Sequence, residues 1–136
     1  MTAEITTVQA WQDAANNQAI DRLLALSAPD IAIIGPRGRG SGHQLLRDWL
    51  ARAGLTLTTQ RIFQRGDTVV LAQRGRWQSS ATGGMASEAD LASRFQIRDQ
   101  RVIEFERYDD LASALAAANM SNADERLSAT QSSKGE

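Results

Sequence analysis

Polar and apolar residues alternate along Asp90–Asp110, in two segments that meet at the polar turn Asp99-Gln100-Arg101. This alternation predicts a β-hairpin. Successive side chains of a strand point to opposite faces, so one face should be apolar and the other charged. The expected inner face carries Leu91, Ser93, Phe95, Ile103, Phe105 and Arg107. The expected outer face carries Asp90, Arg94, Gln96, Arg98, Val102, Glu104, Glu106 and Tyr108. Arg107 is therefore a cation on an otherwise apolar face.

The N-terminal part of the chain follows the three- and four-residue spacing of amphipathic helices instead. This spacing predicts one helix over Glu4–Asn17 and a second over Ala19–Ser27. Pro29 should end the second helix, because proline lacks the backbone N–H that a helix needs. A short buried strand over Asp30–Ile34 is expected next, followed by a loop over Gly35–Gly40.

A third helix is predicted from Ser41 to about Ala53. Ser41 and Gln44 have the spacing of a capping box, in which each side chain bonds a free backbone N–H at the helix start. Gly54 should end this helix, since glycine readily adopts the left-handed conformation of a helix C-terminus.

The remainder returns to the two-residue period of β-strands. The predicted strands are Thr56–Arg65, Thr68–Ser79, Ala86–Arg98 and Val102–Tyr108, which together form an antiparallel meander. Asp110 can cap a last helix over Leu111–Asn119. We expect residues 1–120 to form one domain and residues 121–136 a disordered tail, because the tail has almost nothing to bury. The fold class is α+β, with helices on one face of a curved antiparallel sheet.

Composition narrows the function. The chain has 136 residues, 42% hydrophobic residues and a net charge of −1, which is typical of a globular domain and argues against nucleic-acid binding. With no cysteine and one histidine, His43, we expect no metal site and no cofactor. Apolar runs are too short for a membrane span, and the start lacks signal-peptide features, so a cytoplasmic protein is expected.

The order of these elements resembles the nuclear transport factor 2-like superfamily, also called SnoaL-like. Its members include ketosteroid isomerases, polyketide cyclases, scytalone dehydratases and limonene epoxide hydrolases. The features that carry the resemblance, from about Val8 to Asn119, are the Trp11 helix, Asp30–Pro36, Gly42–Trp49, Ser93-Arg94-Phe95, and Arg101-Val102 leading to Tyr108-Asp109-Asp110. The resemblance implies a cone-like sheet with three helices on its concave face, a short C-terminal helix, and a homodimer formed through the outer sheet face.

The catalytic pattern of the ketosteroid isomerases is missing. In that family an acidic residue before the proline of the first-strand loop abstracts a proton, and Gly35 occupies this position. A tyrosine and a neutral aspartic acid hold the enolate oxygen in the family, and Trp11 and Leu91 stand there instead. Asp90 is one residue away, which places it on the opposite face. The acidic base of the polyketide cyclases, near Leu91 to Ser93, is also missing. We expect ketosteroid isomerase chemistry to be absent.

The catalytic candidates are His43, Arg107 and Asp109. Arg107 can anchor a ligand carboxylate or carbonyl through its guanidinium, or form an ion pair with Asp109 at the cavity rim. His43 can act as a general base, or be an exposed residue of the first helical turn. The Gly35–Gly42 loop, with Arg37 and Arg39, can bind an anion, but it lacks the Lys-Ser/Thr ending of a nucleotide-binding P-loop.

Other candidates belong to a ligand-binding wall or to the core. Gln73 and Ser93 can orient a ligand, or be satisfied internally. The three tryptophans can line an apolar cavity, or simply fill the core. The predicted ligand-binding set is Trp11, Trp49, Gln73, Trp77, Leu91, Ser93, Phe105 and Arg107.

Three functions remain open. The first is binding of a small apolar or amphipathic molecule in a mostly apolar pocket. The second is an isomerase, cyclase, dehydratase or hydrolase that uses Arg107, Asp109 or His43. The third is a non-catalytic dimerisation module whose pocket is filled, which a cavity well below a few hundred Å³ would indicate.

Overall fold

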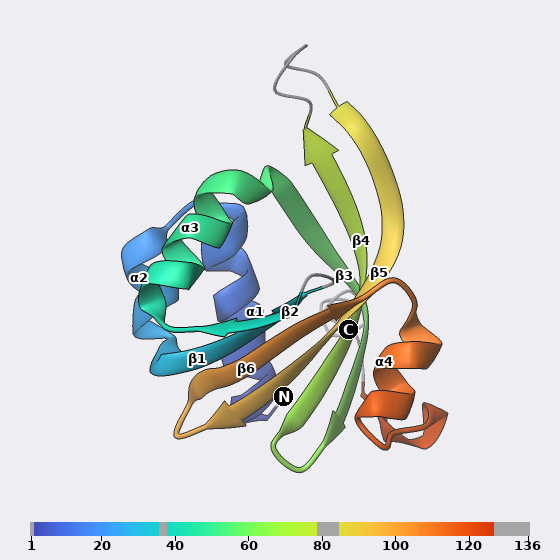
Figure 1. The fold of residues 1–136 in the computed structure, drawn as a ribbon. Coiled ribbons are helices and arrows are strands. Elements are labelled where there is room, and N and C mark those ends of the chain that lie inside the picture. The colour runs from blue at the N-terminus through green and yellow to red at the C-terminus, as the bar shows by residue number, and fades with distance from the viewer. Residues whose placement is uncertain (1, 36–37, 79–84, 127–136) are drawn as a thin grey trace, which may run out of the picture.

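The fold is an α+β arrangement of four helices and a curved, unclosed sheet (Figure 1). The computed structural model describes residues 2–35, 38–78 and 85–126. The helices are α1 (Ala3–Asn16), α2 (Ile20–Ala25), α3 (His43–Ala53), α4 (Leu111–Ala117) and the short 3₁₀ helix η1 (Asn122–Asp124). The strands are β1 (Ser27–Gly35), β2 (Gly38–Ser41), β3 (Leu55–Arg65), β4 (Thr68–Gln78), β5 (Met85–Arg98), β6 (Arg101–Tyr108) and β7 (Glu125–Arg126).

The sheet confirms the predicted meander and adds three strands to it. The strand order is β2-β1-β6-β5-β4-β3-β7, and the pairs from β3 to β6 are antiparallel. Strand β1 lies parallel to β6, with Ile33 opposite Phe105. This pairing carries the first strand and its loop to the edge of the predicted hairpin.

Within the predicted Gly35–Gly40 loop, residues 38–40 in fact belong to β2, which pairs with β1, and residues 36–37 lie outside the described part of the chain. Ser41 is the last residue of β2 and lies opposite Ala32. The predicted capping box is therefore wrong: Gly42 is the N-cap of α3, and no side chain caps this helix. Gly54 ends α3 in the left-handed conformation, as predicted.

A bulge corrects the faces of the β5–β6 hairpin. Its turn consists of Asp99 and Gln100, both with positive φ. The register shifts between Gln96 and Ile97, so that Ile97 pairs with Val102 while Gln96 pairs with Glu104. An extra residue on one strand changes which side chains face the core. Val102, predicted on the outer face, is fully buried, and Ile103 is half-exposed.

The end of the described chain returns to the sheet. Strand β7 pairs with β3, where Glu125 lies opposite Phe63, and the Arg61 guanidinium donates two hydrogen bonds of 2.9 Å to the Glu125 carboxylate. The prediction of a disordered tail is wrong for residues 121–126. Residues 127–136 lie outside the described part of the chain.

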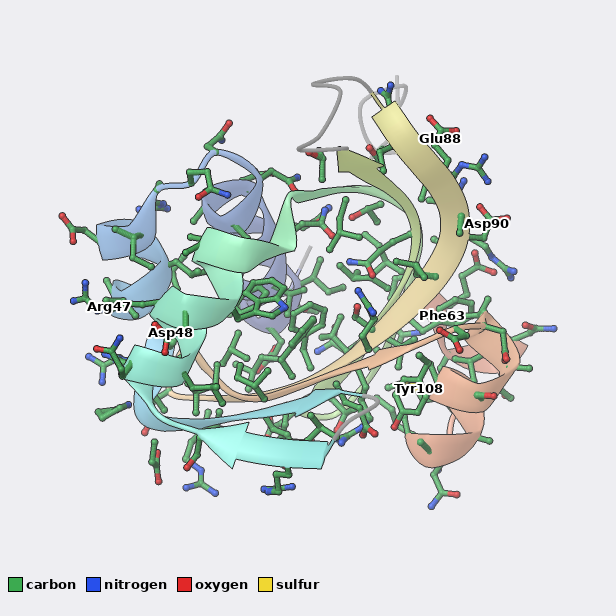
Figure 2. All side chains as sticks on the ribbon, turned by 45° about the horizontal axis from the view of Figure 1, so that its top comes forward. Arg47, Asp48, Phe63, Glu88, Asp90 and Tyr108 are labelled. Carbon is green, nitrogen blue, oxygen red and sulfur yellow. The ribbon has the colours of Figure 1, made fainter. Side chains whose placement is uncertain are left out.

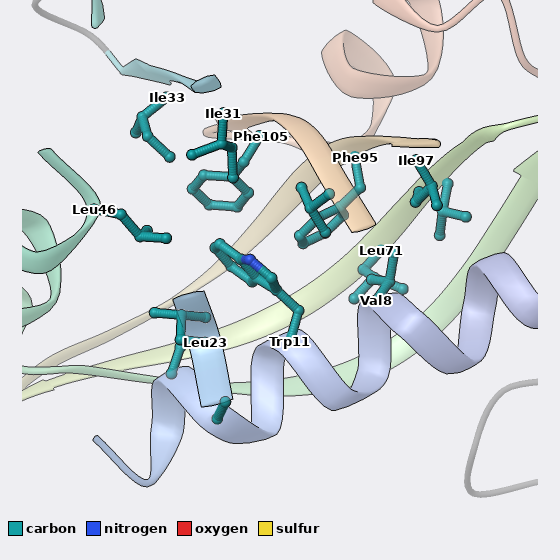
Figure 3. Close-up of a cluster of buried hydrophobic side chains, with 14 of the residues drawn as sticks. Val8, Trp11, Leu23, Ile31, Ile33, Leu46, Leu71, Phe95, Ile97 and Phe105 are labelled. Atoms are coloured by element: carbon teal, nitrogen blue, oxygen red, sulfur yellow. The ribbon is translucent and has the colours of Figure 1, made fainter. Parts of the chain in front are cut away.

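Helices cover both faces of the sheet. Helices α1 to α3 lie on its concave side, and α4 lies on the convex side (Figure 1). The concave core contains Val8, Trp11, Leu71, Phe95 and further buried residues around them (Figure 3). A smaller convex cluster under α4 is formed by Phe63, Val70, Ala92, Ala114 and Met120, with Tyr108 packed against it. Among the described residues, no helix has the length and apolar character needed to cross a membrane.

Candidate functional site

A cavity of about 610 Å³ opens between the β1–β2 hairpin, α3 and β6. This volume lies within the range of about 300–1,000 Å³ that is usual for small-molecule sites. Among the described residues, it is lined by Ile33, Ile34, Gly35, Gly38, Arg39, Gly40, Leu45, Trp49, Phe105 and Arg107. The wall is thus mostly aliphatic, aromatic and glycine backbone.

Helical spacing on α3 and the pairing of β1 with β6 bring these residues together. Leu45 and Trp49 are four residues apart on α3, so they share one face of the helix. The parallel pairing of β1 with β6 places Ile33 beside Phe105. Gly40 allows α3 to approach the hairpin closely, because a Cβ atom there would lie 2.5 Å from Leu45 Cδ2. The cavity is therefore enclosed by segments from both ends of the domain.

An aromatic cluster supports this wall from the core side. The Trp11 ring lies 6.0 Å from the Trp49 ring, stacked, and 5.0 Å from the Phe105 ring, tilted. Trp11 is only 1% exposed, and its Nε1 donates a 2.9 Å hydrogen bond to Ser27 Oγ. Trp11 is absent from the described cavity lining; its ring packs against Phe105 on the core side of the wall (Figure 3).

Gln73 and Ser93 belong to a buried chain of hydrogen bonds, which we call the amide network. Ser93 Oγ donates to Gln73 Oε1, and Gln73 Nε2 donates to Gln12 Oε1. Gln12 Nε2 then donates to Thr59 Oγ1, which donates to Gln9 Oε1. Gln73 and Ser93 are fully buried. These two predicted ligand-binding residues are satisfied by neighbouring side chains and are absent from the described cavity lining.

The three catalytic candidates lie in different places. Arg107 lines the cavity, whereas Asp109 is exposed after the end of β6. His43 is half-buried, with Nε2 3.2 Å from the carbonyl oxygen of Ser27, and lines a second cavity of about 410 Å³. Arg107 and His43 therefore face different spaces, and no acid–base pair is formed between them.

The isomerase positions carry no acidic group. Gly35 lies in the cavity wall, and Leu91 is 6% exposed and pairs with Gln73. Asp90 is on the convex face, where its carboxylate accepts a 3.0 Å hydrogen bond from Arg74. The Trp77 side chain lies outside the described residues. Asp and Glu are absent from the described lining of the cavity, and the described chain contains no cluster of three or more His, Asp or Glu able to hold a metal.

The two arginines of the lining point to different faces. Arg39 pairs with Ile34, which lies opposite Glu106 on the convex side of the sheet. Its guanidinium is accordingly 3.5 Å from Glu104, and the side chain is 61% exposed. Arg107 follows Phe105 by two residues, which places both on the concave face. The Arg107 side chain is the cation that the sheet directs toward the cavity.

The convex face carries a network of ion pairs behind the cavity. Arg94 bonds Glu104 and Glu106, and Tyr108 donates a 2.6 Å hydrogen bond to Glu106. Burial alone would lower the pKa of Arg94, but its interactions with Glu104, Tyr108 and Glu106 outweigh burial and raise the pKa. Burial and the bond to Glu106 raise the pKa of the Tyr108 hydroxyl. Glu88 and Asp90 extend the charged surface along β5 (Figure 2).

The model of the SnoaL-like domain matches residues 8–105, which is most of the chain. The chain belongs to the SnoaL-like domain family. A comparison with curated proteins finds no significant match.

Solved structures similar to this SnoaL-like domain share its fold at low identity. TerC, co-crystallised with polyporic acid, is 20% identical with a TM-score of 0.71, over 88% of this chain and 98% of TerC. RV0760c from Mycobacterium tuberculosis, in complex with estradiol-17beta-hemisuccinate, is 19% identical with a TM-score of 0.70, over 82% and 97% of the two chains. A putative SnoaL-like polyketide cyclase from Jannaschia sp. CCS1 is 20% identical with a TM-score of 0.68, over 85% and 90%. These likenesses confirm the cone-like fold.

Sequence reasoning missed much of the cavity wall of this SnoaL-like domain. Of the predicted ligand-binding set, the described lining contains Trp49, Phe105 and Arg107. It also contains Ile33, Leu45 and three glycines of the hairpin, which that set did not include. Leu45 had a usable signal, because it precedes Trp49 by four residues on one helix face. The glycines had none, since a Gly- and Arg-rich segment lacks the alternation that predicts a strand.

Proposed function

We propose that this SnoaL-like domain binds a small, mostly apolar or amphipathic organic molecule in the cavity beside β1, β2, α3 and β6. The observation that carries the proposal is the cavity itself, at about 610 Å³ with Trp49, Phe105 and Leu45 in its wall. A dimerisation module with a filled pocket would have no such space. Apolar surface of this kind favours ligands with an aromatic or aliphatic body.

The similar structures support this proposal. RV0760c is in complex with a steroid hemisuccinate, and TerC was co-crystallised with polyporic acid. Both share the fold of this chain, so a molecule of comparable size is a reasonable occupant of its cavity.

Binding is favoured over catalysis by the placement of the candidate residues. The described cavity wall holds Arg107 but neither Asp109 nor His43. General acid–base catalysis requires a proton-transferring group within hydrogen-bond reach of the ligand, and an arginine stays protonated at ordinary pH. These placements support ligand binding over acid–base catalysis at the described wall.

A neutral probe, 2-naphthalenemethanol, tests the proposal by titration calorimetry and by the indole resonances in NMR spectra. We expect binding that shifts the Trp49 indole, and at least a tenfold loss of affinity in Leu45→Phe, whose larger ring fills the space. Leu111→Phe is the matched control, because Leu111 packs on the convex side. Absence of binding by this probe and by its carboxylate analogue, or equal affinity in the two variants, would contradict the proposal.

We also propose that the protein forms a homodimer through the part of the convex face that α4 leaves open, and that it acts in the cytoplasm. This surface carries charges of both signs, on Arg74, Arg76, Glu88 and Asp90, which suits the polar part of an interface. Light scattering should give twice the chain mass of 14.8 kDa. A monomer mass at tens of micromolar protein would contradict the dimer, and cell fractionation tests the location.

A further inference from the structure

We propose that the cavity selects an amphipathic anion, a molecule with an aromatic or aliphatic body and one carboxylate that is held by Arg107. This inference rests on the proposed function and specifies the chemical class of its ligand.

The charge of the described wall favours an anion. Its described members include no Asp or Glu, so no described side chain there repels an anion. The nearest glutamates on β6, Glu104 and Glu106, bond Arg94 on the convex face. A cation beside mostly apolar surface attracts an anion more strongly than the same cation in open water.

Arg107 lies on the face of β6 that borders the cavity. The residue shares the concave face with Phe105, and both line the cavity. In the neighbouring strand it lies opposite Ser93, whose hydroxyl donates to Gln73 within the amide network. Arg107 is therefore placed on the sheet next to both Phe105 of the apolar wall and Ser93 of the network. An anion bonded to it would leave its apolar body against Phe105 and Trp49.

Arg39 has a different direction from Arg107. Its guanidinium is directed to Glu104 on the convex side, although the residue contributes to the cavity lining. Arg39 is thus a second arginine of the described lining, but its guanidinium is directed away from the cavity.

The test compares two probes that share one ring system, 2-naphthoate and 2-naphthalenemethanol, by titration calorimetry. We expect 2-naphthoate to bind the wild-type protein about tenfold more tightly, because a charged hydrogen bond adds to a common apolar contribution. Arg107→Gln should remove this preference and change the affinity for the alcohol by less than about twofold. Arg107→Lys should keep part of the preference, because it retains the charge but not the fork. Arg98→Gln, at an exposed position at the end of β5 that is absent from the described cavity lining, should leave the preference unchanged.

Equal affinity of the two probes in the wild-type protein would overturn the inference and leave the proposed function standing. A preference for 2-naphthoate that Arg107→Gln retains, or that Arg98→Gln removes, would also overturn it. Absence of binding by both probes would overturn the inference together with the proposed function. A salt titration of the wild-type protein needs no variant to fold: added salt should weaken 2-naphthoate binding and leave the alcohol unchanged, and equal salt dependence would contradict Arg107 as the anchor.

Discussion

The cavity and the amide network lie on the same concave side of the sheet, and neighbouring residues of α1 serve them. Trp11 supports the aromatic wall of the cavity, and Gln12 joins Gln73 in the network. The network is filled: each of its side chains bonds the next. The cavity is open, and its described wall presents apolar surface and the Arg107 cation to a space of ligand size.

This difference separates two uses of buried polar groups. Gln73 and Ser93 lie on the predicted ligand face, yet their hydrogen bonds are directed to protein partners. Buried polar groups that satisfy one another rigidify the core and specify its packing. We infer that the network fixes the position of α1 over the sheet, which in turn holds Trp11 behind the cavity wall.

Truncation of Phe105 should have the largest effect, because it damages the cavity side and spares the network. Phe105 is 2% exposed and packs on Trp11 and Trp49. Phe105→Ala should lower the free energy of unfolding by about 3–5 kcal/mol, as large-to-small core changes do, and should abolish probe binding. Urea denaturation and calorimetry measure the two effects.

Phe63→Ala is the matched control for this change. Phe63 is fully buried in the convex cluster (Figure 2), so we expect a similar loss of stability with probe affinity retained in the folded protein. Equal loss of affinity in the two variants would show that the cavity and the convex cluster are not independent.

Gln73→Leu should disrupt the amide network and spare the cavity. The change leaves Gln12 Oε1 and Ser93 Oγ without their partner, which costs about 1–3 kcal/mol of stability for buried polar groups. Probe affinity should stay within about twofold of the wild-type value, because Gln73 is not in the described cavity wall. The exposed Gln60→Leu is the control and should change stability by less than about 0.5 kcal/mol. A large loss of probe affinity in Gln73→Leu would place the network within the binding site.

Lowering the pH should affect neither the cavity nor the amide network first. Its effect on stability should be the smallest of the effects considered. The network contains only amides and hydroxyls, whereas Asp110 caps α4 on the other side of the sheet. The Ser113 backbone N–H donates a 2.7 Å hydrogen bond to the Asp110 carboxylate and lowers its pKa. The cap therefore contributes stability above the unfolded pKa, near 3.9, and loses it as the pH falls through the lower folded value.

NMR titration of the Asp110 carboxyl carbon and the Ser113 amide measures this effect. Both should titrate below the ordinary aspartate pKa, while the Gln73 side-chain amide stays unchanged. Asp110→Asn should remove the titration at Ser113. A midpoint at or above the ordinary value would refute the cap.

The sequence predicted the fold through its regular segments. Alternation identified the four strands of the meander, and helical spacing identified α1 and α2, because the local period reflects which face is buried. Long-range pairing was not visible in this way. The parallel contact of β1 with β6, the strand β2 and the strand β7 depend on partners far along the chain.

The candidate site was predicted in part for the same reason. Trp49, Phe105 and Arg107 lie in regular elements, so their faces followed from period. The bulge near Ile97 exchanged Val102 for Ile103 in the core, and no local pattern signals such a bulge. Whether Gln73 and Ser93 bond a ligand or each other depends on Gln12, a residue of α1 that alternation in the strands does not include.

The parallel pairing of β1 with β6 also has a consequence for the order of folding. The walls of the cavity come from the N-terminal third of the chain and from its last long strand, so closing them costs more loop entropy than pairing neighbouring strands. During synthesis, Trp11 and Trp49 are made well before Phe105, the ring that completes their packing. The cavity cannot form until β6 has been synthesised, so its assembly is among the last steps of folding.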